Sequence, residues 1–230
     1  MKEYFVTGTD TGVGKTTVAC AILAAGRARG LQVDAIKPVE TGCPTDEEGR
    51  MVAADAIALA GAAGHETRPR ALEMYRAPLA PSVAAELEGR IVDVELIESG
   101  IQLLRSRKLD FLLVEGAGGL LVPLTDTLDM AGLAAHLRLP LLIVARDSLG
   151  TINHTLLTLE AAARRGLAVA GIVLSAAAPG TSRTDAERNA LEISRRGKAR
   201  VLGIFPHQDD LSPAALARAA ETHLDLSALL

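Results

Sequence analysis

The sequence predicts an α/β protein with a mostly parallel sheet that helices cover on both faces. Apolar stretches of strand length alternate along the chain with stretches of helical periodicity. Strands that are apolar throughout are typical of parallel sheets buried on both sides. A glycine-rich turn also joins the first strand directly to the first helix. Because no linker-like stretch and no internal repeat interrupts the 230 residues, we expect one domain over residues 1–230.

The first half of the chain begins with an apolar strand and a helix that stops before Gly30, a residue suited to the position after a helix. Residues 61–81 show no clear period, and Pro69, Pro78 and Pro81 interrupt them. We expect these residues to form an irregular excursion over the sheet edge or the active site. The elements predicted in this half are strands at 4–6 and 33–36, helices at 16–29 and 51–60, and a polar loop at 43–50.

The second half continues the alternation. Helix 94–107 carries apolar residues at helical spacing, which indicates one buried face; they are Leu96, Ile97, Ile101 and Leu104. Further helices are predicted at 130–137, 153–165, 184–196 and 213–221. The strands of this half are apolar throughout and are predicted at 111–114, 139–145, 169–174 and 201–205, with a Pro-Gly loop at 179–180.

The stretch from Gly8 to Thr16 predicts a phosphate-binding P-loop, and hence a P-loop NTPase-type protein. Glycines let the backbone wrap an oligophosphate with its N–H groups inward, and the start of the next helix adds partial positive charge. In this motif Lys15 reaches the terminal phosphates and the Thr16 hydroxyl holds Mg²⁺. Five residues separate Gly8 from Gly14, whereas the usual pattern has four. An ordinary glycine-rich turn is the alternative, but strand, Gly-Lys-Thr and helix all fall in register.

Composition and charge exclude several classes of function. With 49% apolar and 23% charged residues the chain is globular, and no apolar run approaches the roughly 18 residues of a membrane helix. We see no signal peptide, and two cysteines form no disulfide framework, so we expect a cytoplasmic protein without a membrane partner. A net charge of −4 and 2% aromatic residues argue against nucleic-acid binding. The five histidines lack ligand spacing, so we expect no zinc.

Unusual polar residues follow several predicted strands. In open α/β sheets ligands bind beyond the carboxyl ends of the strands. There Glu115 can complete the shell of a magnesium ion, and Lys37 ends the second apolar strand. Taken singly, Glu115 could be a loop acid, Lys37 a solvated lysine and Asp55 a helix-surface acid. Asn153 could likewise be an N-cap. Their occurrence together at successive strand ends favours a ligand site.

Four stretches of the sequence together resemble the dethiobiotin synthetases of biotin biosynthesis. They are YFVTGTDTGVGKT at 4–16, KPVETG at 37–42, VEGAGG at 114–119 and LGTINHTLLT at 149–158. The resemblance extends essentially from end to end, in order and with similar spacing. The five-residue insert in the P-loop is itself a feature of that family.

The resemblance implies a fold, an assembly and a reaction. The fold is a seven-stranded parallel sheet, and the assembly is a homodimer. The reaction uses ATP and Mg²⁺. CO₂ adds to an amine of 7,8-diaminopelargonate to give a carbamate, which attacks the γ-phosphate to give a carbamic–phosphoric anhydride. The second amine then closes the ring, so that dethiobiotin, ADP and phosphate are released.

The resemblance also implies the site residues. Lys15, Lys37 and Thr11 would be catalytic, and Thr16, Asp55 and Glu115 would bind Mg²⁺. The ATP-binding residues would be Gly12, Val13, Gly14, Lys15, Thr16, Thr17, Asp55, Glu115, Gly116, Ala117, Gly118, Ser175, Ala176, Phe205, Pro206 and His207. The substrate-binding residues would be Thr11, Lys37, Thr41, Gly118, Leu149, Gly150, Thr151 and Asn153. In the family, the carboxylate clamp around Asn153 comes from the partner subunit.

Two positions depart from the family pattern. Gly12 stands where some members carry a glutamate that contacts the loop. Ser175 stands where an asparagine commonly reads the edge of adenine, although Phe205 and Pro206 still match the far side of the base pocket. The first departure concerns the order of the P-loop, and the second concerns nucleotide selectivity.

Two other classes of P-loop protein compete with this interpretation. Amidase-type synthetases of cobyrinate carry a glutaminase domain with a nucleophilic cysteine, for which 230 residues leave no room. ParA/MinD-type ATPase switches have an extra lysine early in the P-loop, where this chain has Thr9, Asp10 and Thr11. They also often end in a basic amphipathic helix, unlike the terminal HLDLSALL of this chain.

Overall fold

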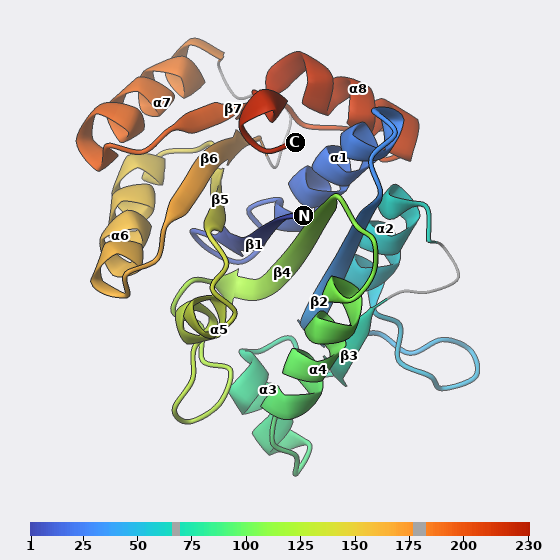
Figure 1. The fold of residues 1–230 in the computed structure, drawn as a ribbon. Coiled ribbons are helices and arrows are strands. Elements are labelled where there is room, and N and C mark those ends of the chain that lie inside the picture. Colours follow the sequence, from blue (N-terminus) through green and yellow to red (C-terminus); the bar gives the residue numbers. More distant parts are fainter. Residues whose placement is uncertain (66–69, 177–182) are drawn as a thin grey trace.

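The computed structural model describes residues 1–65, 70–176 and 183–230 (Figure 1). Within these residues, seven strands form one parallel sheet in the order β3-β2-β4-β1-β5-β6-β7. This confirms the parallel sheet that the sequence predicts. The strands are β1 (Lys2–Gly8), β2 (Val33–Thr41), β3 (Ala71–Tyr75), β4 (Phe111–Gly119), β5 (Leu141–Arg146), β6 (Val169–Ser175) and β7 (Val201–Phe205).

Helices cover both faces of the sheet (Figure 1). Successive strand residues point to opposite faces, so Phe111 and Leu113 belong to one apolar cluster, and Leu112 and Val114 to the other. The first cluster packs against α1 (Lys15–Ala28), α2 (Ala54–Ala63) and α8 (Pro213–His223). The second packs against α3 (Pro81–Leu87), α4 (Val94–Arg105), α5 (Met130–His136), α6 (Thr151–Arg164) and α7 (Arg183–Gly197).

The six strands and seven helices predicted from the sequence all occur, with ends displaced by a few residues. The expectation of irregular structure over residues 61–81 is wrong for residues 61–63 and 71–75, whereas residues 76–80 form no helix or strand and 66–69 lie outside the described residues. Helix α2 continues to Ala63, and β3 forms the edge of the sheet. Of the prolines that suggested irregularity, Pro81 begins α3. Pro69 and the Pro-Gly loop at 179–180 lie outside the described residues.

The sheet order places the carboxyl ends of β2, β4 and β1 side by side. Ile36 of β2 pairs with Val114 of β4, so the next residues, Lys37 and Glu115, are neighbours. Glu115 in turn pairs with Val6 of β1, shortly before the glycine-rich loop. Three distant segments of the sequence therefore meet at the carboxyl end of the sheet. In the described part of the chain, no helix is long and apolar enough to span a membrane.

Candidate active site

The glycine-rich loop ends in a backbone conformation that favours glycine. Gly14 has φ 94° and lies at the N-cap position of α1, and Gly12 has φ 69°. A Cβ atom on Gly14 would lie 2.5 Å from Oγ of Ser175, so a larger residue would clash there as well as be strained. The loop therefore brings β6 against the P-loop and leaves the first N–H groups of α1 as anion donors.

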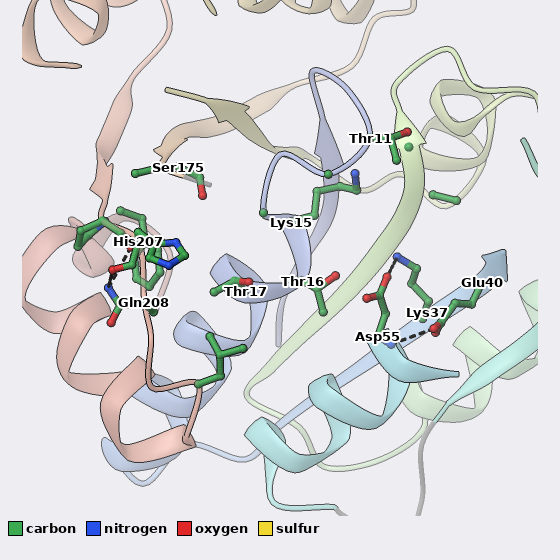
Figure 2. Close-up of a pocket in the computed structure, with 18 of the residues that line it drawn as sticks. Thr11, Lys15, Thr16, Thr17, Lys37, Glu40, Asp55, Ser175, His207 and Gln208 are labelled. Atoms are coloured by element: carbon green, nitrogen blue, oxygen red, sulfur yellow. Dashed lines mark hydrogen bonds and ion pairs between the residues drawn. The ribbon is translucent and has the colours of Figure 1, made fainter. Parts of the chain in front are cut away.

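Lys15 extends from the first turn of α1 into the cavity (Figure 2). It is 7% exposed, and its Nζ donates a hydrogen bond to the Asp10 carbonyl oxygen at 3.2 Å. Burial, together with repulsion from Lys37, lowers the pKa of Lys15 below its ordinary value. A buried cation with a neutral carbonyl as its hydrogen-bond partner is well placed to receive an anion such as a phosphate.

Lys37 of β2 lies between two carboxylates. Its Nζ is 2.7 Å from Oδ2 of Asp55 and 2.7 Å from Oε1 of Glu115. The same Oε1 accepts a hydrogen bond from the Thr16 hydroxyl at 2.8 Å. Figure 2 shows Lys37 pointing toward Asp55, which α2 brings to the end of β2. These contacts bring together the three predicted metal ligands and the predicted catalytic lysine.

The charges of this cluster stabilise one another. Burial alone would lower the pKa of Lys37, but Glu115 and Asp55 outweigh it and raise that pKa above its ordinary value. Burial would raise the pKa of Asp55, but the attraction of Lys37 more than offsets it, so that pKa is lowered. Both groups are therefore charged at neutral pH, as an electrostatic role requires.

The oxygen atoms of Thr16, Asp55 and Glu115 fit a magnesium ion. Glu115 is fully buried, and its Oε2 has no hydrogen-bond partner among the described residues. A buried carboxylate oxygen without a partner is costly, and a bound cation would remove that cost. Hard oxygen donors are the ligands that Mg²⁺ prefers. No three His, Cys, Asp or Glu side chains gather into a metal site within the residues described. A cation here would therefore depend on Thr16 and on phosphate or water.

A cavity of about 480 Å³ extends along the P-loop. In Figure 2, Ser175, His207 and Gln208 lie on one side of Lys15, and Thr11, Lys37 and Asp55 lie on the other. The cavity thus has two compartments, one on each side of Lys15; the one lined by Ser175 and His207, which are predicted to bind ATP, is called the base compartment. The predicted residues that line it are Thr11, Gly12, Gly14, Lys15, Thr16, Thr17, Lys37, Thr41, Asp55, Ala117, Gly118, Ser175, Ala176, Phe205, Pro206 and His207.

Some predicted site residues do not line this cavity. Val13 is buried in the core, and the Gly116 carbonyl oxygen accepts a hydrogen bond from Lys37 at 3.4 Å. The residues predicted for the carboxylate clamp lie apart from the cavity, at the N-terminus of α6. There Leu149 is fully exposed and Thr151 is buried. The clamp around Asn153 remains a prediction, and it assigns these residues to the site of a second subunit.

Sequence reasoning missed four residues at the site. Glu40, Gln208 and Leu211 line the cavity. Gln208 donates hydrogen bonds to the carbonyl oxygens of Pro206 and His207 at 2.9 and 3.0 Å, which fixes the turn beside the base compartment. The Arg146 guanidinium donates a hydrogen bond to the Gly12 carbonyl oxygen at 3.0 Å and so links the end of β5 to the P-loop. Strand-end position is a sequence signal for Arg146, which follows the apolar strand 139–145, and for Glu40, which lies in the stretch KPVETG after the predicted strand 33–36.

The loop at the start of α1 and the parallel sheet define a P-loop nucleotide-binding protein. Solved structures share the fold: a ParA family ATPase from Chlorobium tepidum TLS is 17% identical, with a TM-score of 0.55 over 96% of this chain and 92% of that chain. At this identity the likeness shows the fold alone. A family model described as an AAA domain matches residues 2–215.

Relatives define the family more closely. The ATP-dependent dethiobiotin synthetase BioD of Anaeromyxobacter dehalogenans (strain 2CP-1 / ATCC BAA-258) is 46% identical over 219 residues, which cover 94% of each chain. The enzyme of the same description from Pseudomonas aeruginosa strain PAO1 is 39% identical, over 100% of this chain and 98% of the relative. The chain belongs to the dethiobiotin synthetase family, which confirms the resemblance seen in the sequence.

Proposed function

We propose that this chain catalyses the ATP- and Mg²⁺-dependent closure of 7,8-diaminopelargonate and CO₂ to dethiobiotin. The observation that carries the proposal is the ammonium of Lys37 between Asp55 and Glu115, in the compartment that lies across Lys15 from Ser175 and His207. The family relationship supports the same activity.

In the proposed reaction, CO₂ adds to an amine of the substrate and a proton is lost, which leaves a carbamate. A carbamate oxygen attacks the γ-phosphorus of ATP, and ADP leaves. The second amine then attacks the carbonyl carbon of the anhydride, and phosphate leaves as the ring closes. Two anions, carbamate and triphosphate, must approach each other in the first transfer.

The residues of this chain make that approach possible. The P-loop N–H groups and Lys15 would hold the triphosphate, and the ammonium of Lys37 would neutralise both anions when they bind beside it. Thr11 and Thr41 offer hydroxyl groups on the substrate side of the cavity. Thr16, Asp55 and Glu115 would hold Mg²⁺, which would neutralise charge on the transferring phosphoryl group.

We also propose that the working enzyme is a homodimer in the cytoplasm. The N-terminus of α6 offers N–H groups to a carboxylate, yet it lies outside the cavity of its own chain. A second subunit would bring this helix end to the substrate.

The test is incubation of the purified protein with diaminopelargonate, bicarbonate and MgATP. We expect dethiobiotin and phosphate in equal amounts, and neither product without diaminopelargonate. Phosphate release without dethiobiotin would instead favour a ParA/MinD-type ATPase switch, to which the likeness is one of fold.

A further inference from the structure

Glu40 is a buried carboxylate at the active site to which the proposed reaction gives no role. It lies near the end of β2, three residues after Lys37, and is 6% exposed. Its Oε1 accepts a hydrogen bond from the Asp55 backbone N–H at 2.9 Å, and its Oε2 accepts one from the Ala56 N–H at 3.0 Å. Both carboxylate oxygens are therefore occupied by the first turn of α2.

Helix α2 lacks a cap of its own. Ala53 stands at its N-cap position and has no polar side chain to accept the free N–H groups of the first turn. Glu40 supplies that cap from a neighbouring strand. The capped residue, Asp55, is the one whose side chain contacts Lys37, and Figure 2 shows Glu40, Asp55 and Lys37 together. The cap and the ion pair thus hold the same residue from two sides.

A simpler cap would have been sufficient for the helix alone. A serine at position 53 would accept the same kind of hydrogen bond without burying a charge. Glu40 is instead a carboxylate that is only 6% exposed, and removing a charge from water is costly even where two N–H groups pair with it. What Glu40 provides beyond an ordinary cap is a direct link from β2, which carries Lys37, to Asp55.

We propose that Glu40 is a positioning residue that fixes Asp55 for cation binding and for its contact with Lys37. The proposal rests on the proposed magnesium-dependent function. In this scheme Glu40 acts through Asp55, because both of its oxygens accept N–H groups from the first turn of α2. Residues that hold a metal ligand in place typically change metal affinity about 10- to 100-fold when they are replaced.

The experiment measures metal binding rather than turnover. Mn²⁺ is titrated into the full-length protein with a non-hydrolysable ATP analogue, and free Mn²⁺ is followed by electron paramagnetic resonance. For Glu40→Ala we expect an affinity about 10- to 100-fold weaker than in the wild type. For Glu40→Gln we expect a smaller loss, because an amide oxygen still accepts one of the two N–H groups.

The matched control is Asp93→Ala. Asp93 caps α4, accepts the Leu96 N–H at 2.9 Å, and does not line the cavity. We expect it to lower the melting temperature as Glu40→Ala does, with Mn²⁺ affinity unchanged. If both variants weaken Mn²⁺ binding equally, or if neither does, the positioning role is wrong.

A crystal structure of Glu40→Gln separates this proposal from the proposed function. We expect Asp55 to move away from Lys37, whereas retention of the 2.7 Å contact would overturn the positioning role. If the wild type binds no Mn²⁺ with nucleotide, the proposed metal-dependent function fails. A displaced Asp55 would still support the positioning role, so the two failures are distinguishable. If Glu40→Ala does not fold, Mn²⁺ affinity is compared between the wild type and Glu40→Gln instead.

Discussion

Lys37 is the residue whose removal tests the proposed chemistry most directly. For Lys37→Ala we expect turnover to fall by about two orders of magnitude or more, because the charge that neutralises the reacting anions is lost. ATP binding should be largely retained, since Lys15 and the loop N–H groups hold the triphosphate. Turnover by steady-state assay and ATP affinity by calorimetry check both parts. The control is Lys108→Ala, a change at an exposed position. If Lys37→Ala keeps wild-type turnover, Lys37 does not neutralise the reacting anions.

The second prediction at the scale of a single residue concerns Ser175 and the choice of nucleotide. Its hydroxyl packs toward Gly14, and a single hydroxyl pairs with less of the adenine edge than an asparagine would. We expect the wild type to use GTP and CTP better, relative to ATP, than Asn-bearing relatives do, and Ser175→Asn to favour ATP more strongly. The measurement is kcat/KM for the three nucleotides, with Ser106→Asn as a surface control. Strong ATP preference in both proteins would show that position 175 does not select the base.

At the scale of elements, α6 offers a test of the dimer. Lys15→Ala and Asn153→Ala damage different halves of the proposed site, so each homodimer should be inactive. Mixed dimers would contain one intact site, and equal mixing should restore roughly one quarter of wild-type turnover. A mixture of Lys15→Ala and Lys37→Ala is the control, because both changes lie in the same half. If subunits exchange and activity does not return, the clamp is not contributed by a partner.

Sequence patterns predicted the elements that bury uninterrupted apolar stretches. Strand β3 was not predicted, because two of its buried residues carry polar groups. Glu73 is 4% exposed and forms an ion pair with Arg90. The Tyr75 hydroxyl donates a hydrogen bond to Glu73 at 3.0 Å. Arg90 also stacks over the Tyr75 ring at 4.5 Å. Such a strand looks like a surface segment in the sequence, because its partner lies on another element.

The same limit applies to the site. Glycine spacing and strand-end positions in the sequence pointed to Lys15, Lys37 and Glu115. The contacts of Glu40 with α2 and of Arg146 with the P-loop depend on how β2 and β5 lie relative to distant segments. No local pattern encodes a hydrogen bond between a side chain and the backbone of another element, so these residues required the structure.

At the scale of the whole molecule, the C-terminus packs against β1 and belongs to the apolar cluster that α1 also joins. Leu229 is fully buried, and the Tyr4 hydroxyl donates to its carbonyl oxygen at 3.4 Å. For Leu229→Ala we expect a loss of about 2–5 kcal/mol in the free energy of unfolding. Leu191→Ala, at an exposed position, should change it by less than about 0.5 kcal/mol. Urea denaturation measures both; equal effects would mean that the C-terminal packing contributes little.

The shared oxygen of Glu115 has a consequence for how the site is loaded. Oε1 accepts Lys37 and Thr16, whereas Oε2 has no partner among the described residues. A divalent cation that bound at Oε2 alone would leave both contacts at Oε1 in place. One that also took Oε1 would compete with the ammonium, which ends a long flexible chain. In ion-exchange terms, Lys37 is the resident counterion of Glu115, and a magnesium ion would be its competitor.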